Sequence, residues 1–186
     1  MGFIEHRRHT SIRRHLDARD YIWLATLGSV TRGALPIDDV APIVAGLAGP
    51  LWAPTGQLIA DAIDEMVVTD LLGTTRAGDG QLRLTGTIPG RARLHDLLVQ
   101  SVHAPLTAFG QVGVRIKLAF LDLLPAPQRQ RQIEALTVAY ECEIAGRSGA
   151  CPAWAHNGPL GRLWLDAQVS GLEDGLALLR RLAREP

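Results

Sequence analysis

Residues 52–91 read WAPTGQLIADAIDEMVVTDLLGTTRAGDGQLRLTGTIPGR, and the rest of the chain is organised around this stretch. From residue 57 to residue 68 the apolar side chains come in adjacent pairs that recur every four residues, which predicts an α-helix with one buried face. Residues 54–56 are a start signal for this helix. Residues 76–80 are rich in types that accept positive φ and predict a β-hairpin tip, with residues 81–85 as the return strand.

A further helix is predicted to open near residues 90–91, directly after the hairpin. The order helix, hairpin, helix is that of a winged helix-turn-helix, in which the first helix reads DNA and the hairpin is the wing. Many other α+β domains contain a helix followed by a hairpin, so the order alone does not decide between them. The predicted fold class is mainly α with a small β-hairpin wing.

The composition is that of an ordinary globular protein. The 186 residues suit one domain, or one small domain with a helical extension. The 47% of hydrophobic and 20% of charged residues argue against disorder throughout. The 19 basic and 19 acidic residues cancel, which argues against a surface that binds nucleic acid everywhere but leaves local patches open.

The chain carries no sign of a membrane or a secretion route. No apolar run approaches the roughly 20 residues that span a bilayer, and the N-terminus lacks the apolar core of a signal peptide. We therefore expect a cytoplasmic protein with no membrane partner. In that compartment Cys142 and Cys151 are expected to be reduced thiols rather than a disulfide.

Residues 1–17 form a basic arm that includes Arg13 and Arg14. The arm is either a solvated terminus or a segment that touches DNA phosphates beside a winged helix. Residues 20–31 predict the first helix. A short second helix over residues 40–47, with Asp38 or Asp39 as its N-cap, accommodates Pro42 in its first turn.

The second half of the chain is predicted to be helical. Helices are expected over residues 91–102, from residue 106 to the prolines at 125 and 127, and from residue 128, with a loop over residues 145–161. The last helix has the clearest pattern of the chain, because its apolar residues alternate steps of four and three. These apolar stripes either pack within one chain or form an antiparallel dimer interface. The interface candidates are Phe120, Leu165, Leu172, Leu176 and Leu179.

Three segments of the chain resemble the PadR family of bacterial transcriptional regulators. Residues 54–66, PTGQLIADAIDEM, occupy the position of the family's recognition helix. Residues 88–94, IPGRARL, are similar to the family's Thr-Pro-x-Gly-Arg-x-x-Leu motif after the wing. Residues 117–125, KLAFLDLLP, resemble the family's aliphatic and aromatic run that ends in Leu-Leu-Pro and are the most specific of the three.

The resemblance implies a winged helix over residues 18–103 and a helical dimerisation region over residues 104–186. It also implies a homodimer that binds palindromic operator DNA, and often a pocket for a small aromatic effector. The aromatic residues of the helical half are either such a pocket or simply core. They are Phe109, Phe120, Trp154 and Trp164.

The predicted reading unit departs from the family in its charge. Between Ala34 and Thr75 the sequence contains no Lys or Arg, while six residues are acidic. Carboxylates repel phosphates, so binding is expected to be weaker than in relatives with cationic helices. The remaining contact candidates are the helix start, the wing and the arm. They are Thr55, Gly56, Gln57, Arg76, Arg83, Arg91, Arg13 and Arg14.

Two functions remain open on these observations. One is a dimeric repressor that binds DNA, which the arginines of the arm and wing favour. The other is a related protein with weakened or lost DNA binding that acts through protein or ligand contacts, which the acidic helices favour. An enzyme is the least supported class, because the sequence shows no nucleophile elbow, phosphate-binding loop or metal-spaced His and Cys set. We expect no catalytic residue, cofactor or metal.

Overall fold

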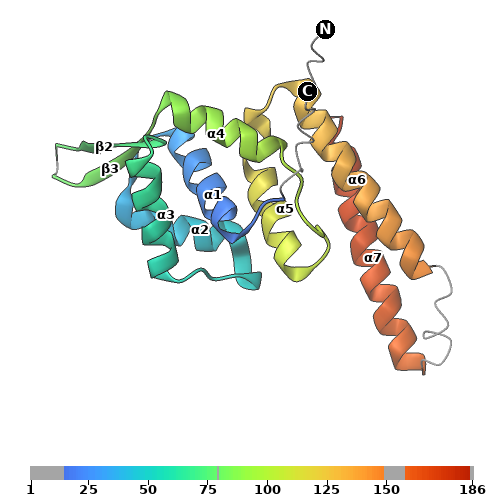
Figure 1. Ribbon diagram of the computed structural model, residues 1–186. Helices are drawn as coiled ribbons and strands as arrows, with labels where there is room; N and C mark the ends of the chain where they lie inside the picture. Colours follow the sequence, from blue (N-terminus) through green and yellow to red (C-terminus); the bar gives the residue numbers. More distant parts are fainter. Residues whose placement is uncertain (1–14, 79, 149–157, 185–186) are drawn as a thin grey trace, which may run out of the picture.

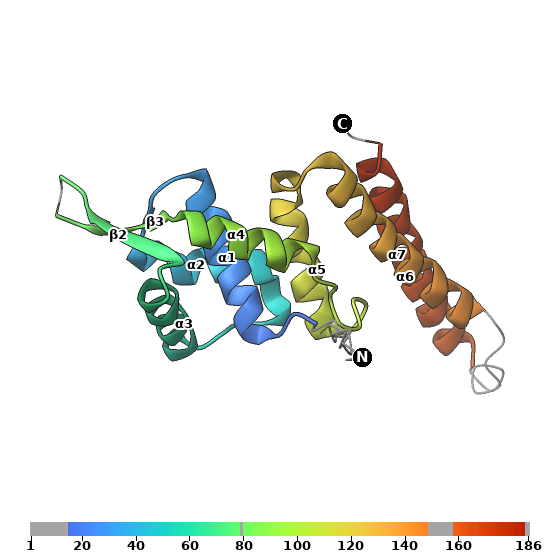
Figure 2. The ribbon, with the colours of Figure 1, turned by 45° about the horizontal axis from the view of Figure 1, so that its top comes forward.

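The computed structural model describes residues 15–78, 80–148 and 158–184. It is mainly helical with a small antiparallel sheet, which confirms the predicted fold class (Figure 1). A compact body carries the sheet at one side and a long pair of antiparallel helices at the other (Figures 1 and 2). In chain order the elements are α1 (Ala18–Arg32), β1 (Leu35–Pro36), η1 (Ile37–Asp39), α2 (Val40–Ala48), η2 (Gly49–Leu51), α3 (Gly56–Val68), β2 (Leu72–Arg76), β3 (Leu82–Gly86), α4 (Ile88–Val99), α5 (Ala108–Phe120), η3 (Leu121–Leu123), α6 (Ala126–Ser148) and α7 (Pro159–Leu182).

Helix α1 is the centre of the body. It starts with a capping box, in which the side chains of Asp17 and Asp20 accept hydrogen bonds from each other's backbone N–H groups. Tyr21, Leu24 and Leu27 are almost fully buried, because α2, α3, α4, α5 and β3 all pack around this helix. A helix surrounded in this way has apolar residues on most of its faces.

Helices α2 and α3 form the helix-turn-helix. Helix α2 follows Asp39 directly and accommodates Pro42 in its first turn, as predicted, although the Asp39 side chain makes no capping hydrogen bond. Helix α3 begins after Thr55, whose hydroxyl oxygen accepts a hydrogen bond from the Leu58 N–H at 3.3 Å. One face of α3 is buried, as the periodicity predicts, although Leu58 of the predicted pattern is exposed and Val67 is only partly buried. The buried residues are Ile59, Ala62, Ile63 and Met66.

Strands β2 and β3 form the hairpin predicted for the wing. The sheet order is β1-β3-β2, and both pairings are antiparallel. The two-residue strand β1 was not predicted; its Leu35 pairs with Leu84 of β3. Helix α4 starts directly after the hairpin, because the Thr87 hydroxyl caps the Gly90 N–H at 2.9 Å and donates to the Asp70 carbonyl at 2.7 Å.

Helix α5 packs into the winged-helix body, although the sequence assigned it to the helical region that begins at residue 104. Its Gly113 lies against the Tyr21 ring, and its Phe120 lies against Gly28. In both places a glycine on one helix makes room for an aromatic ring on the other. The apolar stripe of α5 therefore packs on α1 of the same chain, and Phe120 is buried there.

Helices α6 and α7 pack against each other as a hairpin that extends away from the body (Figures 1 and 2). Leu176 and Leu179 are 8% and 3% exposed, and they pack in the core with Ile133 and Tyr140 of α6. The C-terminal part of the predicted stripe of α7 is thus covered from within the chain, whereas Leu165 and Leu172 are partly buried. Phe120, Leu176 and Leu179 are not available to a second protomer, so the alternative of packing within one chain holds for these side chains.

Lys117 connects the body to the hairpin. Its side chain is 2% exposed, and its ammonium group donates to the carbonyl of Gln100 after α4 and, at 2.6 Å, to Oε1 of Gln132 on α6. Burial lowers the pKa of Lys117 to about 8. Among the described residues, no helix is both long and apolar enough to cross a membrane.

Candidate nucleic-acid interface

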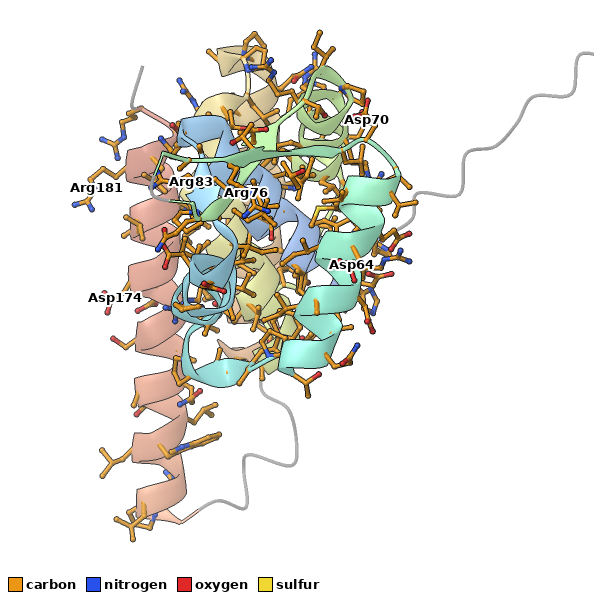
Figure 3. The ribbon with its side chains drawn as sticks, turned by 90° about the vertical axis from the view of Figure 1, so that its left-hand side faces the viewer. Asp64, Asp70, Arg76, Arg83, Asp174 and Arg181 are labelled. Carbon is orange, nitrogen blue, oxygen red and sulfur yellow. The ribbon has the colours of Figure 1, made fainter. Side chains whose placement is uncertain are left out.

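The outward face of α3 is a single stripe on the side of the molecule that also carries the wing (Figure 3). Because residues three and four apart share a helix face, the burial of Ile63 and Met66 sets which side chains point away from the core. Figure 3 shows Asp64 on this helix and Asp70 just beyond its end, with Arg76 and Arg83 on the neighbouring hairpin. The exposed stripe consists of Gln57, Ala60, Asp61, Asp64 and Val68.

The start of α3, which the sequence predicts as an anion contact, is exposed. Thr55, Gly56 and Gln57 are all exposed, and they surround the helix end where N–H groups lack partners within the helix. The Gln57 side chain donates from Nε2 to Oδ1 of Asp61 at 2.6 Å. Because the Leu58 N–H is bonded to the Thr55 cap, a backbone contact at this end would come from Gly56 and Gln57.

The predicted arginines lie on the wing and just after it. Arg76 is exposed at the end of β2 and donates to the carbonyl of Gly80 across the hairpin tip at 3.3 Å. Arg83 lies on β3 opposite Thr75 and is partly buried. Arg91 is exposed in the first turn of α4. Arg76 and Arg83 bring positive charge to the side of the molecule that presents α3 (Figure 3).

One of the acidic residues of α3 already has a cationic partner. Glu65 forms an ion pair with Arg19 of α1. The Arg19 guanidinium lies 5.0 Å from the centroid of the Trp23 ring, and that of Arg93 lies 5.3 Å from it. Arg93 in turn pairs with Asp20 at 3.1 Å. This network ties α1, α3 and α4 together and removes Glu65 from the negative charge that DNA would meet.

The sequence did not predict that network. Arg19 and Glu65 are 46 positions apart, and no local pattern connects them. The sequence shows only that the N-terminal region is basic and the predicted helix acidic. Opposite charges within one small domain are expected to attract each other. Two other predicted DNA contacts, Arg13 and Arg14, lie outside the described residues.

The structure does not bring the predicted effector-pocket residues together. Phe109 packs with Tyr21 and Trp52, at ring-centroid distances of 5.0 and 5.9 Å. Phe120 lies at the other end of α5, and Trp164 is exposed on α7. Trp154 is outside the described residues. The aromatic cluster that does form was not predicted, because Tyr21 and Trp52 belong to the N-terminal half.

Helix α7 has a second apolar face that the sequence reasoning missed. We define this second face by four exposed side chains on the side away from Leu176 and Leu179. Their exposed fractions range from 81% for Leu160 to 42% for Leu178. The small residues Ala167 and Gly171 continue the same face and are also exposed. The four side chains are Leu160, Leu163, Trp164 and Leu178.

Comparison with known proteins gives one family match. The family model described as "Putative AphA-like transcriptional regulator" matches residues 13–183, which is nearly the whole chain. None of the curated proteins matches the chain.

Solved structures of Bacillus subtilis PadR are similar over most of both chains. The structure in complex with operator DNA is 17% identical, covers 87% of this chain and 97% of that chain, and has a TM-score of 0.40. The structure in complex with p-coumaric acid is 14% identical, with 90% and 96% coverage and a TM-score of 0.38. PadR crystallised without a named ligand is 16% identical, with 91% and 97% coverage and a TM-score of 0.40. At these values the assignment to a family rests on the family model.

Proposed function

The chain belongs to the AphA-like family of transcriptional regulators, and we propose that it acts as a homodimer that binds operator DNA through its winged helix. The prediction of a regulator of PadR type is confirmed at the level of family and fold.

The observation that carries the proposal is the exposed stripe of α3 beside an arginine-bearing hairpin. A helix held by one buried face presents the other face to a partner, and the major groove of DNA admits a helix of this size. Arg76, Arg83 and Arg91 would neutralise phosphates on either side of that groove. Phosphate contacts fix the position of the protein on the duplex, so α3 could read bases without being cationic itself.

The second face of α7 supports the homodimer. Large exposed apolar side chains at helical spacing normally mark an interaction surface. In a two-fold symmetric dimer the same face of a second copy would cover Leu160 and Trp164. This assigns the interface to the second face of α7 in place of the buried Leu176 and Leu179.

A second candidate function is regulation through protein or ligand contacts with weak DNA binding. The negative charge of Asp61 and Asp64 on the exposed stripe favours it, because each carboxylate repels the DNA phosphates and lowers the affinity. A small aromatic effector, which the PadR resemblance implies, fits either function. We propose the aromatic cluster of Tyr21, Trp52 and Phe109 as its contact.

A gel shift against the DNA that flanks the protein's own gene tests the proposal. The wild type should shift this DNA, and Arg76→Ala/Arg83→Ala should weaken binding and lower the slope of log K against log salt by about one per lost contact. Arg131→Ala/Arg184→Ala removes the same charge from exposed positions of the α6–α7 hairpin and should bind like the wild type. Equal binding by both double variants would reject the wing as the phosphate contact.

The second candidate function predicts a different result in the same assay. The wild type would then fail to shift DNA at moderate salt. Replacement of Asp61, Asp64 and Glu65 together by neutral residues would create or strengthen binding.

A further inference from the structure

We infer that Asp61 and Asp64 make this regulator select cytosine at the positions that α3 reads, through the cytosine N4 amino group in the major groove. The inference rests on the proposed function, because it requires α3 to enter the groove. The two carboxylates weaken DNA binding by repelling phosphates. The inference gives them a role in selecting the base sequence.

Only the exposed stripe of α3 can reach base edges. Ile59, Ala62, Ile63 and Met66 are held in the core, so the helix cannot turn another face outward without unfolding the domain. Asp61 and Asp64 lie three residues apart near the middle of the stripe, with the small Ala60 beside them. A small side chain at this place lets the helix backbone approach the bases closely, which brings both carboxylates within reach of the groove floor.

The stripe presents more acceptors than donors. One N–H of the Gln57 side-chain amide donates to Asp61 at 2.6 Å, which leaves its second N–H as the one side-chain donor on the stripe. The acceptors are the Gln57 carbonyl oxygen and the carboxylate oxygens of Asp61 and Asp64, and ionised carboxylates only accept hydrogen bonds. The sequence has no Lys or Arg from Ala34 to Thr75 that could add a donor here.

The four bases differ in how they meet such a surface. In the major groove guanine shows two acceptors, N7 and O6, and thymine shows the acceptor O4, so both repel a carboxylate. Adenine shows the N6 donor next to the N7 acceptor, which suits an amide better than a carboxylate. Cytosine shows the N4 donor alone, and Asp and Glu accept a hydrogen bond from it. A desolvated carboxylate opposite the wrong base also loses its hydration without compensation.

Glu65 does not take part in this selection. It lies at the side of the stripe and is paired with Arg19, which is held against Trp23. The unpaired carboxylates of the exposed stripe are therefore those of Asp61 and Asp64, the two positions from which a base edge can be read. The arginines of the wing and α4 supply the opposing attraction through phosphates.

Selection from a pool of double-stranded DNA with a randomised core tests the inference. The wild type should enrich cytosine at two or more positions, by about ten-fold over guanine for each good contact. Asp61→Asn and Asp64→Asn should each move one of these positions toward adenine by a similar factor, because Asn pairs with adenine N6 and N7. Asp166→Asn, an exposed carboxylate on α7, is the matched control and should keep the wild-type motif.

The outcomes separate the inference from the proposed function. A wild-type motif without cytosine, or a motif unchanged in both α3 variants, overturns the inference and leaves DNA binding intact. A wild type that retains no duplex above background overturns the proposed function and the inference together. Both aspartates are exposed, so equal thermal unfolding midpoints of the variants and the wild type will show that the fold is unchanged.

Discussion

Replacement of Lys117 by Met should change how the stability of the protein depends on pH. Lys117 is the single lysine of the sequence, and its ammonium group is buried between α4, α5 and α6. Both of its hydrogen-bond acceptors, the carbonyl of Gln100 and Oε1 of Gln132, are neutral. Removal of water from the charged form is therefore the main influence on this group, and it lowers the pKa from 10.5 to about 8.

The sign of the effect follows from the two protonation states. Between pH 8 and pH 10.5 the lysine is protonated in the unfolded chain and neutral in the folded one, so the unfolded state binds one more proton. The free energy of unfolding then rises with pH, by about 1.4 kcal/mol per pH unit. Over the whole window the gain is about 3 kcal/mol. Below pH 8 both states are protonated, and the cost of burying the charge is present in full.

Urea unfolding of the wild type and Lys117→Met at pH 7, 8, 9 and 10, at one protein concentration, measures this gain. Met also removes two hydrogen bonds, but that loss shifts the whole curve and leaves its slope unchanged. The difference between the two proteins should grow in favour of the wild type from pH 8 to pH 10. Measurements stop at pH 10, because burial raises the pKa of Tyr21 to about 12 and stability from that group falls above pH 10. Parallel curves for the two proteins would refute this reasoning.

Two further substitutions separate the two apolar faces of α7. Leu179→Ala should lower the free energy of unfolding by roughly 2 to 5 kcal/mol, because it leaves a cavity against α6, with sedimentation still showing a dimer. Trp164→Asp should convert the dimer to a monomer in sedimentation while the circular dichroism of the folded helices is kept, because this side chain is 57% exposed in one chain. A dimer that survives Trp164→Asp but dissociates in Leu179→Ala would place the interface on the face that we find buried by α6.

The elements around the wing could be predicted because their signals are local. The buried face of α3 repeats within three turns, and the hairpin tip is marked by glycines within five residues. The start of α4 also has a local signal, in Thr87 and Pro89. The prediction placed this start near residues 90–91, whereas the helix begins at Ile88. Pro at the first turn is a helix start and not a barrier, which accounts for the difference.

The division of the second half of the chain could not be predicted, because it depends on contacts distant in sequence. The break at Ala104 and Pro105 resembles a domain boundary. Helix α5, which follows it, nevertheless packs on α1, where its Gly113 lies against the Tyr21 ring. The regular stripe of leucines in α7 is the strongest pattern of the chain. Its spacing predicts that the stripe is buried, but it does not indicate whether α6 or a second chain covers it. The weaker pattern on the opposite face is the one left exposed.

The charge of the proposed DNA-binding surface also could not be predicted from the sequence. In the fold, the arginines and the aspartates of this surface have different roles. Net charge over the chain is zero, and the local count from Ala34 to Thr75 is wholly acidic. Only the fold shows that Glu65 is paired, that Asp61 and Asp64 are exposed, and that Arg76 and Arg83 lie on the side of the molecule that presents α3 (Figure 3). Attraction to phosphates then comes from the arginines and depends on salt, whereas preference among sequences comes from the aspartates and depends on base identity. Substitutions of the two sets should therefore act independently, with additive free energies wherever their side chains do not touch.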